Sequence, residues 1–291
     1  MKATMTLHTN SRFILTVSCL DTRGIVAAVS NHVMQHQGNI IDSAQFGDES
    51  TGWFFLRMEC TLEGDVSLKD FEQSFADEIA SKFSMQWALH SVEVKPRTIL
   101  MVSKFDHCLV DILHRMHSGT LAIEVPAIIS NHQDLREISQ WYKVPFYHLP
   151  MSEGKAAQEE QVLELVQEHQ ADLVVLARYM QILSPQMCEV LSGRAINIHH
   201  SFLPSFKGAR PYHQAFKRGV KIIGATAHYV TSDLDEGPII EQEVTRVDHS
   251  FKPAELTAAG RDIECLVLAK AIKYHVEHRV LLNGTKTVVF K

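Results

Sequence analysis

The sequence AINIHHSFLPSFKGARPYHQAF (residues 195–216) contains a short apolar strand followed at once by a dense polar segment. Alternate side chains of a strand share one face, so Asn197 and His199 are expected to project together. The polar segment contains residues that oppose both helix and sheet, namely Pro204, Gly208 and Pro211. We therefore expect the residues after the strand to form a shaped loop, and loops at strand ends commonly carry reactive groups.

Apolar strands alternate with helices on both sides of this stretch. Strand patterns lie at residues 98–103, 121–130, 144–149, 172–177, 224–231 and 238–247. Helix patterns lie at residues 134–141, 154–169, 184–191 and 253–278, and a small hairpin is expected around Asn283 and Gly284. This alternation indicates a Rossmann-like α/β domain with a mostly parallel sheet covered on both faces. The segment SKFDH (residues 103–107) stands where a GxGxxG loop would follow the first strand, so a dinucleotide cofactor is not expected.

The amino-terminal part of the chain has a different element order. Strands are predicted at residues 12–20, 39–46, 53–62 and 85–94, with helices starting near Ile25 and Ser67. The order βαββαβ is typical of a ferredoxin-like sandwich. The strand pattern stops before Pro96 and a new apolar strand follows directly. We therefore predict two domains, residues 1–95 and residues 96–291.

Composition and charge exclude several classes of protein. Residues 1–95 carry 7 Lys+Arg against 12 Asp+Glu, and the remainder carries 21 against 22, so neither part has the basic surface of a nucleic-acid binder. The five cysteines are far apart and form no CxxC pair, which argues against a disulfide framework or a structural zinc site. No signal-peptide core or apolar run of about 18 residues is present, so we expect a cytoplasmic protein without a membrane partner.

The segment LTVSCLDTRGIVAAVSNHVMQHQGNIIDSAQF (residues 15–46) resembles an ACT domain, a small regulatory module that binds amino acids. The resemblance covers about the first 90 residues. It implies a possible effector site beside the loop after the first strand, at Asp21, Arg23, Gly24, Asn39 and Ile40. Glycine and methionine are candidate effectors, and such modules commonly pair, which predicts a homo-oligomer. The alternative interpretation is that these residues only form a turn and a helix cap in a domain that serves assembly.

The carboxyl-terminal domain resembles the formyltransferase domain that handles N10-formyltetrahydrofolate. The resemblance rests on N-x-H with S-x-L-P, beginning at Asn197, and on HYVTSDLDEGPI (residues 228–239), and it covers most of residues 97–250. It implies that Asn197, His199 and Asp235 are catalytic and meet above the carboxyl ends of two strands. The implied pterin-binding loop consists of Arg178, Tyr179, Met180, Gln181, Ile182 and Leu183. The implied supporting residues are His228, Ser201 and Gly237.

Formyl-group chemistry suits these residue types. Asn197 and a protonated His199 can donate hydrogen bonds to the oxygen of the formyl group as negative charge develops on it. Asp235 can favour the charged imidazole and can hold and deprotonate a water molecule. This scheme needs no metal and no cofactor, and the sequence contains neither HExxH nor the zinc motif of a deaminase.

The acceptor of the formyl group decides the reaction. Glycinamide ribonucleotide formyltransferases grip a phosphate with a glycine-rich loop, whereas this chain has the bulky segment 104–107 at that place. Methionyl-tRNA formyltransferases resemble the FKGARP segment but carry a basic carboxyl-terminal domain. The combination of an ACT domain with a formyltransferase domain resembles the formyltetrahydrofolate deformylases, hydrolases whose acceptor is water. We therefore expect hydrolysis of N10-formyltetrahydrofolate, which supplies formate to purine synthesis and balances the one-carbon folate pool. The alternatives are formyl transfer to glycinamide ribonucleotide and a non-catalytic regulator that binds folate or an amino acid.

Several polar residues near the motif receive a structural interpretation. The chain has 17 histidines, and a lone histidine is more often packed or solvated than reactive. On that ground we interpret as structural His200, His213, His249, His275 and His278. Asp233 and Glu236 are interpreted as solvated turn residues. Lys207 and Arg210 are candidates to attract the polyglutamate tail of folate, with a solvent-exposed loop as the alternative.

Overall fold

The computed structural model of the protein describes residues 11–63, 67–203 and 211–291. Its internal contacts divide the chain into two compact units, which we describe separately. The first unit comprises Met1–Val94 with His278–Asn283 and Val288–Lys291, and the second comprises Lys95–Glu277 with Gly284–Thr287. The sequence-based division assigned all residues after 95 to the second domain, whereas two short carboxyl-terminal segments make their contacts within the first unit.

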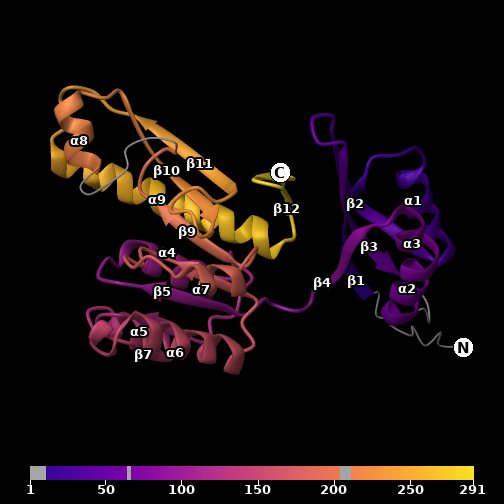
Figure 1. Cartoon of the computed structure of the whole chain (residues 1–291), viewed down its shortest axis with the longest axis horizontal. Coiled ribbons are helices and arrows are strands. Elements are labelled where there is room, and N and C mark those ends of the chain that lie inside the picture. The colour runs from indigo at the N-terminus through magenta and orange to yellow at the C-terminus, as the bar shows by residue number, and fades with distance from the viewer. Residues whose placement is uncertain (1–10, 64–66, 204–210) are drawn as a thin grey trace, which may run out of the picture. The chain divides into compact units, whose positions relative to one another are not determined.

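The first unit is a four-stranded antiparallel sheet with helices packed on one face. Its elements are β1 (Ser11–Leu20), α1 (Ile25–Gln35), β2 (Gly38–Asp48), β3 (Trp53–Leu62), α2 (Leu68–Phe75), a π-helical turn (Ala76–Ala80), α3 (Ser81–Phe83) and β4 (Gln86–Ser91). The strands lie in the order β2-β3-β1-β4. Figure 1 shows the elements from β1 to β4 in indigo and violet. The predicted ferredoxin-like βαββαβ arrangement is confirmed.

The core of this unit follows from the alternation of β1. Phe13, Leu15 and Val17 are fully buried on the face that the helices cover, where they pack with α1 and α2. Gly38 lies where α1 returns into β2, and a Cβ atom there would be 2.7 Å from the Val33 side chain. The close approach of helix and strand therefore requires glycine.

The second unit is built on a seven-stranded sheet in the order β11-β10-β9-β8-β5-β6-β7. The strands are β5 (Thr98–Val102), β6 (Ile128–Ser130), β7 (Phe146–His148), β8 (Leu173–Leu176), β9 (Ala195–His199), β10 (Ile222–Tyr229) and β11 (Ile239–Arg246). The helices are α4 (His107–His117), α5 (Arg136–Tyr142), α6 (Lys155–Glu168), α7 (Pro185–Val190), α8 (Pro211–Arg218) and α9 (Pro253–Val276), with a 3₁₀ turn at Met151–Glu153. Figure 1 shows these elements in magenta to yellow.

Strand direction divides this sheet. Strands β5 to β9 pair in parallel, whereas β10 is antiparallel to both β9 and β11. Every residue of β5, β6 and β8 is buried, as expected for strands covered on both faces. The predicted mostly parallel α/β fold is therefore confirmed. The sequence did not predict that β10 would run antiparallel to its two neighbours.

Three segments differ from the sequence-based expectations. Helix α4 was not predicted, although its buried residues Cys108, Leu109, Ile112 and Leu113 have helical spacing. The strand expected at 121–130 is paired as a ladder only at Ile128–Ser130, because Pro126 lacks the N–H donor that a ladder needs. Helix α8 begins at Pro211 instead of a loop, since proline is well tolerated in the first turn of a helix.

The carboxyl-terminal strands β12 (Val280–Asn283) and β13 (Lys286–Val289) form a small two-stranded sheet, as the sequence predicted. None of the helices in the described part of the chain is long and apolar enough to cross a membrane.

Candidate active site

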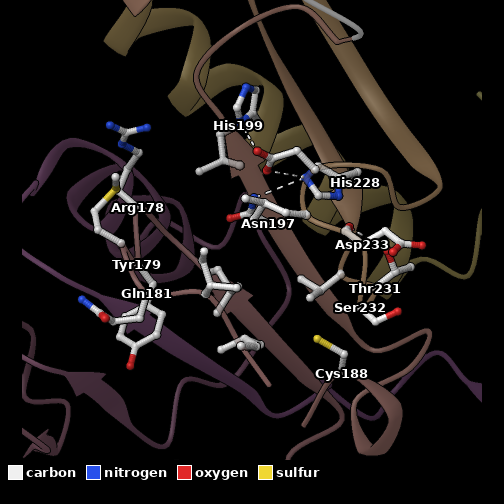
Figure 2. Close-up of a pocket in the computed structure, with 18 of the residues that line it drawn as sticks. Arg178, Tyr179, Gln181, Cys188, Asn197, His199, His228, Thr231, Ser232 and Asp233 are labelled. Atoms are coloured by element: carbon white, nitrogen blue, oxygen red, sulfur yellow. Dashed lines mark hydrogen bonds and ion pairs between the residues drawn. The ribbon is translucent and has the colours of Figure 1, made fainter. Parts of the chain in front are cut away.

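A cavity of about 250 Å³ lies beside β8 and β9 in the second unit. Its lining comes mainly from residues 178–183 after β8, residues 197–200 at the end of β9 and residues 230–235 after β10. Figure 2 shows side chains from all three segments around it. The cavity therefore gathers the two motifs and the loop that the sequence singled out.

Asn197 and His228 form a cross-strand pair, because they are register partners on β9 and β10. The Nδ1 atom of His228 lies 2.9 Å from the carbonyl oxygen of Tyr229, which can only accept a hydrogen bond, so Nδ1 carries the proton. The side-chain amide of Asn197 makes a hydrogen bond with Nε2 of His228, with Nδ2 at 3.2 Å. This bond orients the amide and leaves its second N–H for another acceptor.

Asp235 contacts both histidines of the cavity. Its carboxylate lies 3.3 Å from Nδ1 of His199 and 3.7 Å from Nε2 of His228. The hydrogen bond with His199, followed by the contact with His228, holds the pKa of Asp235 well below its ordinary value. Asp235 is therefore ionised near neutral pH, while Nε2 of His199 is buried and has no hydrogen-bond partner in the described part of the chain.

Asp235 reaches His199 by a route that the sequence did not predict. We expected the three residues to meet above the carboxyl ends of two strands, and this is wrong for β10. Because β10 is antiparallel to β9, its last residue Tyr229 pairs with Ile196 and points the chain away from His199. The loop after β10 turns back, and Asp235 has φ 59, a left-handed conformation that is uncommon outside glycine.

Gly237 makes that return possible. A Cβ atom at this position would be 1.8 Å from the carbonyl oxygen of Tyr229, the same oxygen that accepts the proton of His228. Ser201, the other predicted supporting residue besides His228, is buried and does not line the cavity. Its carbonyl accepts a hydrogen bond from the Thr226 hydroxyl, so its position in the described structure is that of a packing residue.

The segment 178–183 presents an apolar rim to the cavity. Met180 is 53% exposed and Ile182 is 59% exposed, and Leu234 on the opposite loop is 56% exposed. The alternating residues Tyr179 and Leu183 are buried, and the Tyr179 hydroxyl donates to Gln158 while burial raises the pKa of Tyr179 to about 12. Exposed apolar side chains around a polar cluster suit a flat ring system that carries a polar reacting group.

The comparisons with known proteins agree with one another. Residues 96–272 match the model of the family described as formyl transferase. A formyltetrahydrofolate deformylase of Corynebacterium sp. (strain P-1) is 50% identical over 281 residues, which cover 96% of this chain and 98% of that protein. The crystal structure of a formyltetrahydrofolate deformylase from Burkholderia mallei has a TM-score of 0.93 and 49% identity, covering 97% of this chain and 100% of the other. The chain belongs to the formyltetrahydrofolate deformylase family.

Proteins that transfer a formyl group are more distant from this member of the formyltetrahydrofolate deformylase family. The glycinamide ribonucleotide transformylase 1 of Symbiobacterium toebii has a TM-score of 0.66 and 28% identity, covering 70% of this chain and 98% of the other. The shared part has the size of the second unit alone, so the first unit belongs to the deformylase type of chain.

The five candidate effector residues lie in two separate groups, at opposite ends of the sheet of the first unit. Asp21, Arg23 and Gly24 follow the end of β1, where Leu20 pairs with Trp53. Asn39 and Ile40 begin β2, at the end of the sheet that holds Leu62. The ten residues of β3 separate these ends by about 30 Å. Within one chain the two groups do not meet.

Three residues of this deformylase-family site were missed or dismissed by sequence reasoning. His200 and Asp233 both line the cavity, although both were interpreted as structural or solvated. Glu264 is 1% exposed on α9, next to apolar Ile263 and near Val267. A charged residue on an apolar helix stripe was a visible signal for Glu264, whereas nothing local distinguished His200. Lys207 and Arg210 lie outside the described residues.

In the described part of the chain, one cluster of side chains has the spacing of metal ligands. Ligand atoms of His107, Cys108 and Glu264 lie within 4.8 Å of one another. A hydrogen bond with Cys265 and burial raise the pKa of the Cys108 thiol, so the thiol stays protonated and is a poor ligand. Glu264 is in turn occupied by His107, Tyr212 and Arg178. The geometry therefore favours a hydrogen-bonded cluster over a metal site.

Proposed function

We propose that this protein hydrolyses N10-formyltetrahydrofolate to formate and tetrahydrofolate, with water as the acceptor. The observation that carries this proposal is the ionised Asp235 that contacts His199 and His228 in the lining of a cavity with an apolar rim. Full-length similarity to formyltetrahydrofolate deformylases supports the same reaction.

Three residues divide the chemistry. The free N–H of Asn197 donates to the formyl oxygen, and His199, which lies beside the Asp235 carboxylate, donates a second hydrogen bond. Asp235 holds the attacking water. Its lowered pKa makes it a weak base, so it does not retain the proton that water loses as the new C–O bond forms. That proton passes to N10 as the C–N bond breaks, which releases tetrahydrofolate and formic acid. Formic acid then gives its acidic proton to solvent and leaves as formate.

The segment after β5 supports water over a phosphorylated acceptor. The ring of Phe105 packs 5.2 Å from the Arg178 guanidinium, and His107 lies 2.8 Å from the buried carboxylate of Glu264. Side chains therefore fill this place and prevent the close backbone approach by which a glycine-rich loop holds a phosphate group. Transfer to glycinamide ribonucleotide is for these reasons not favoured.

An acceptor-free assay tests the proposal. The purified protein is incubated with 10-formyltetrahydrofolate alone, and formate and tetrahydrofolate are measured. We expect the two products in equal amounts without any amine acceptor. The hydrolase proposal would be contradicted if the protein released no formate, or if turnover started only when glycinamide ribonucleotide was added. Undiminished turnover after treatment with a chelator is expected, since the proposed scheme uses no metal and no cofactor.

The amino-terminal unit is proposed to be an ACT-type regulatory domain that responds to an amino acid such as glycine or methionine. Strand β2 is an edge strand of its sheet. If two copies pair through β2 about a two-fold axis, the strands run antiparallel, and Asn39 of one copy approaches the Asp21–Gly24 turn of the other. This pairing would assemble the two separated groups into one effector site in a homo-oligomer.

The setting of the reaction is also part of the proposal. All five cysteines are free, and four of them are buried, which suits the reducing cytoplasm. There the released formate would supply purine synthesis and balance the one-carbon folate pool.

A further inference from the structure

Glu264 is a buried carboxylate of the second unit that the proposed chemistry does not use. It is 1% exposed and lies in the middle of α9. Two hydrogen-bond donors reach it, the Tyr212 hydroxyl of α8 and Nε2 of His107 of α4, each at 2.8 Å. The guanidinium of Arg178, after β8, forms an ion pair with it, with Nε at 3.4 Å. An isolated carboxylate in such a place would be costly, so its partners must compensate its charge.

The surroundings of Glu264 are shaped for this set of contacts. One turn earlier on α9 stands Gly260, where a Cβ atom would be 2.0 Å from the Tyr212 hydroxyl oxygen. Only glycine therefore lets Tyr212 reach Glu264. Burial opposes the charge of Glu264, but the hydrogen bond from His107, the charge of Arg178 and the hydrogen bond from Tyr212 outweigh it and lower the pKa of Glu264.

Arg178 connects this carboxylate to the candidate active site. Arg178 is the first residue of the cavity segment 178–183 and has φ 64, a left-handed conformation that its surroundings must hold. Figure 2 shows Arg178 at the edge of the cavity. Its Nη1 atom donates to Nδ1 of His200 over 2.8 Å. Accepting this bond requires a neutral His200 ring.

His200 stands directly beside His199, with 4.8 Å between the ring centroids. Burial, followed by the charges of Arg178 and His199, lowers the pKa of His200 to about 4. The hydrogen bond from Arg178 therefore holds a neutral His200 directly beside His199, the imidazole that contacts Asp235.

We propose that Glu264 is a positioning residue for the hydrolytic site: it acts through Arg178, holding the start of the folate-facing segment 178–183 and the hydrogen bond from Arg178 to His200. Glu264 touches neither water nor folate in this scheme. The inference rests on the proposed function, because its readout is formate release.

A double-mutant cycle tests it. Glu264→Gln keeps the shape of the side chain and removes its charge, and we expect kcat/KM to fall about tenfold or more, with a rise in KM for 10-formyltetrahydrofolate. Arg178→Gln should have a similar effect. Because one residue acts through the other, the double variant should be little worse than the more damaged single variant. Asp262→Asn, an exposed change on the same helix, is the matched control and should be neutral.

A second experiment asks whether the negative charge itself is needed. Glu264→Ala leaves a space lined by Arg178, Tyr212 and His107, and sodium acetate should restore activity to this variant, whereas sodium chloride at equal ionic strength should not. Tetrahydrofolate formation is the readout, so that carboxylates do not interfere. If the alanine variant does not fold, the double-mutant cycle stands alone.

The outcomes separate the two proposals. A wild-type protein that releases no formate contradicts the proposed function. An active wild type with a folded Glu264→Gln variant of equal kcat/KM, or fully additive effects of the Glu264 and Arg178 substitutions, overturns the positioning role alone.

Discussion

At the scale of single residues, Asp235 is the group on which the proposed chemistry depends most. Asp235→Asn keeps the size of the side chain but loses the negative charge that lies 3.3 Å from Nδ1 of His199. We expect kcat to fall by roughly 10²–10³-fold, the range seen when one stabilising group of a transition state is removed. Folate binding, followed by fluorescence quenching, should persist.

Glu236→Gln provides the neighbouring control for this change, since Glu236 is exposed and does not line the cavity. It should retain activity. Unchanged turnover in Asp235→Asn would remove Asp235 from the mechanism and would leave His228 and His199 to be tested in its place.

The lowered pKa of His200 predicts a pH dependence of stability. Between pH 6.5 and about 4 the unfolded chain binds a proton at this residue that the folded chain does not bind. The contribution of a neutral His200 to the free energy of unfolding is therefore present above pH 6.5 and is lost as the pH falls toward 4. Urea unfolding across this range should show a smaller loss for His200→Gln, whose amide oxygen can accept from Arg178 without titrating. An equal loss in both proteins would show that His200 is not responsible.

At the scale of elements, the segment 178–183 presents Met180 and Ile182 to solvent while Tyr179 and Leu183 anchor it. Replacing both exposed residues by serine should raise KM for 10-formyltetrahydrofolate by about tenfold or more, because each apolar side chain contributes to burying the pterin ring. The value of kcat should change little, since neither side chain reaches the reacting atoms.

Trp141→Ser is the matched control for that change. Trp141 is 83% exposed on α5 and lies outside the cavity. A KM that rises equally in the control and in the Met180 and Ile182 variant would mean that general loss of apolar surface, and not the rim, causes the effect.

At the scale of the whole molecule, the proposed pairing through β2 predicts a separable regulatory function. Ile41 is 47% exposed on this edge strand, and Ile41→Lys places a charge where a second copy would pair. We expect a smaller particle by light scattering and loss of any response to glycine or methionine. Formate release without effector should remain, because the cavity is formed by the second unit. A variant with wild-type mass would exclude β2 as the pairing edge.

The sequence by itself determined the elements and the residue types of the site. The element order βαββαβ of the amino-terminal part and the continuous apolar strands of the second unit predicted both fold classes, because local periodicity reports where strands and helices lie. The motifs around Asn197 and Asp235 named residues that the structure brings together. Only tertiary structure decided how they meet, since the reversed direction of β10 depends on which distant strands pair. The same holds for Glu264, whose partners lie 52, 86 and 157 positions away, and for the effector residues, which strand direction places at opposite ends of one sheet.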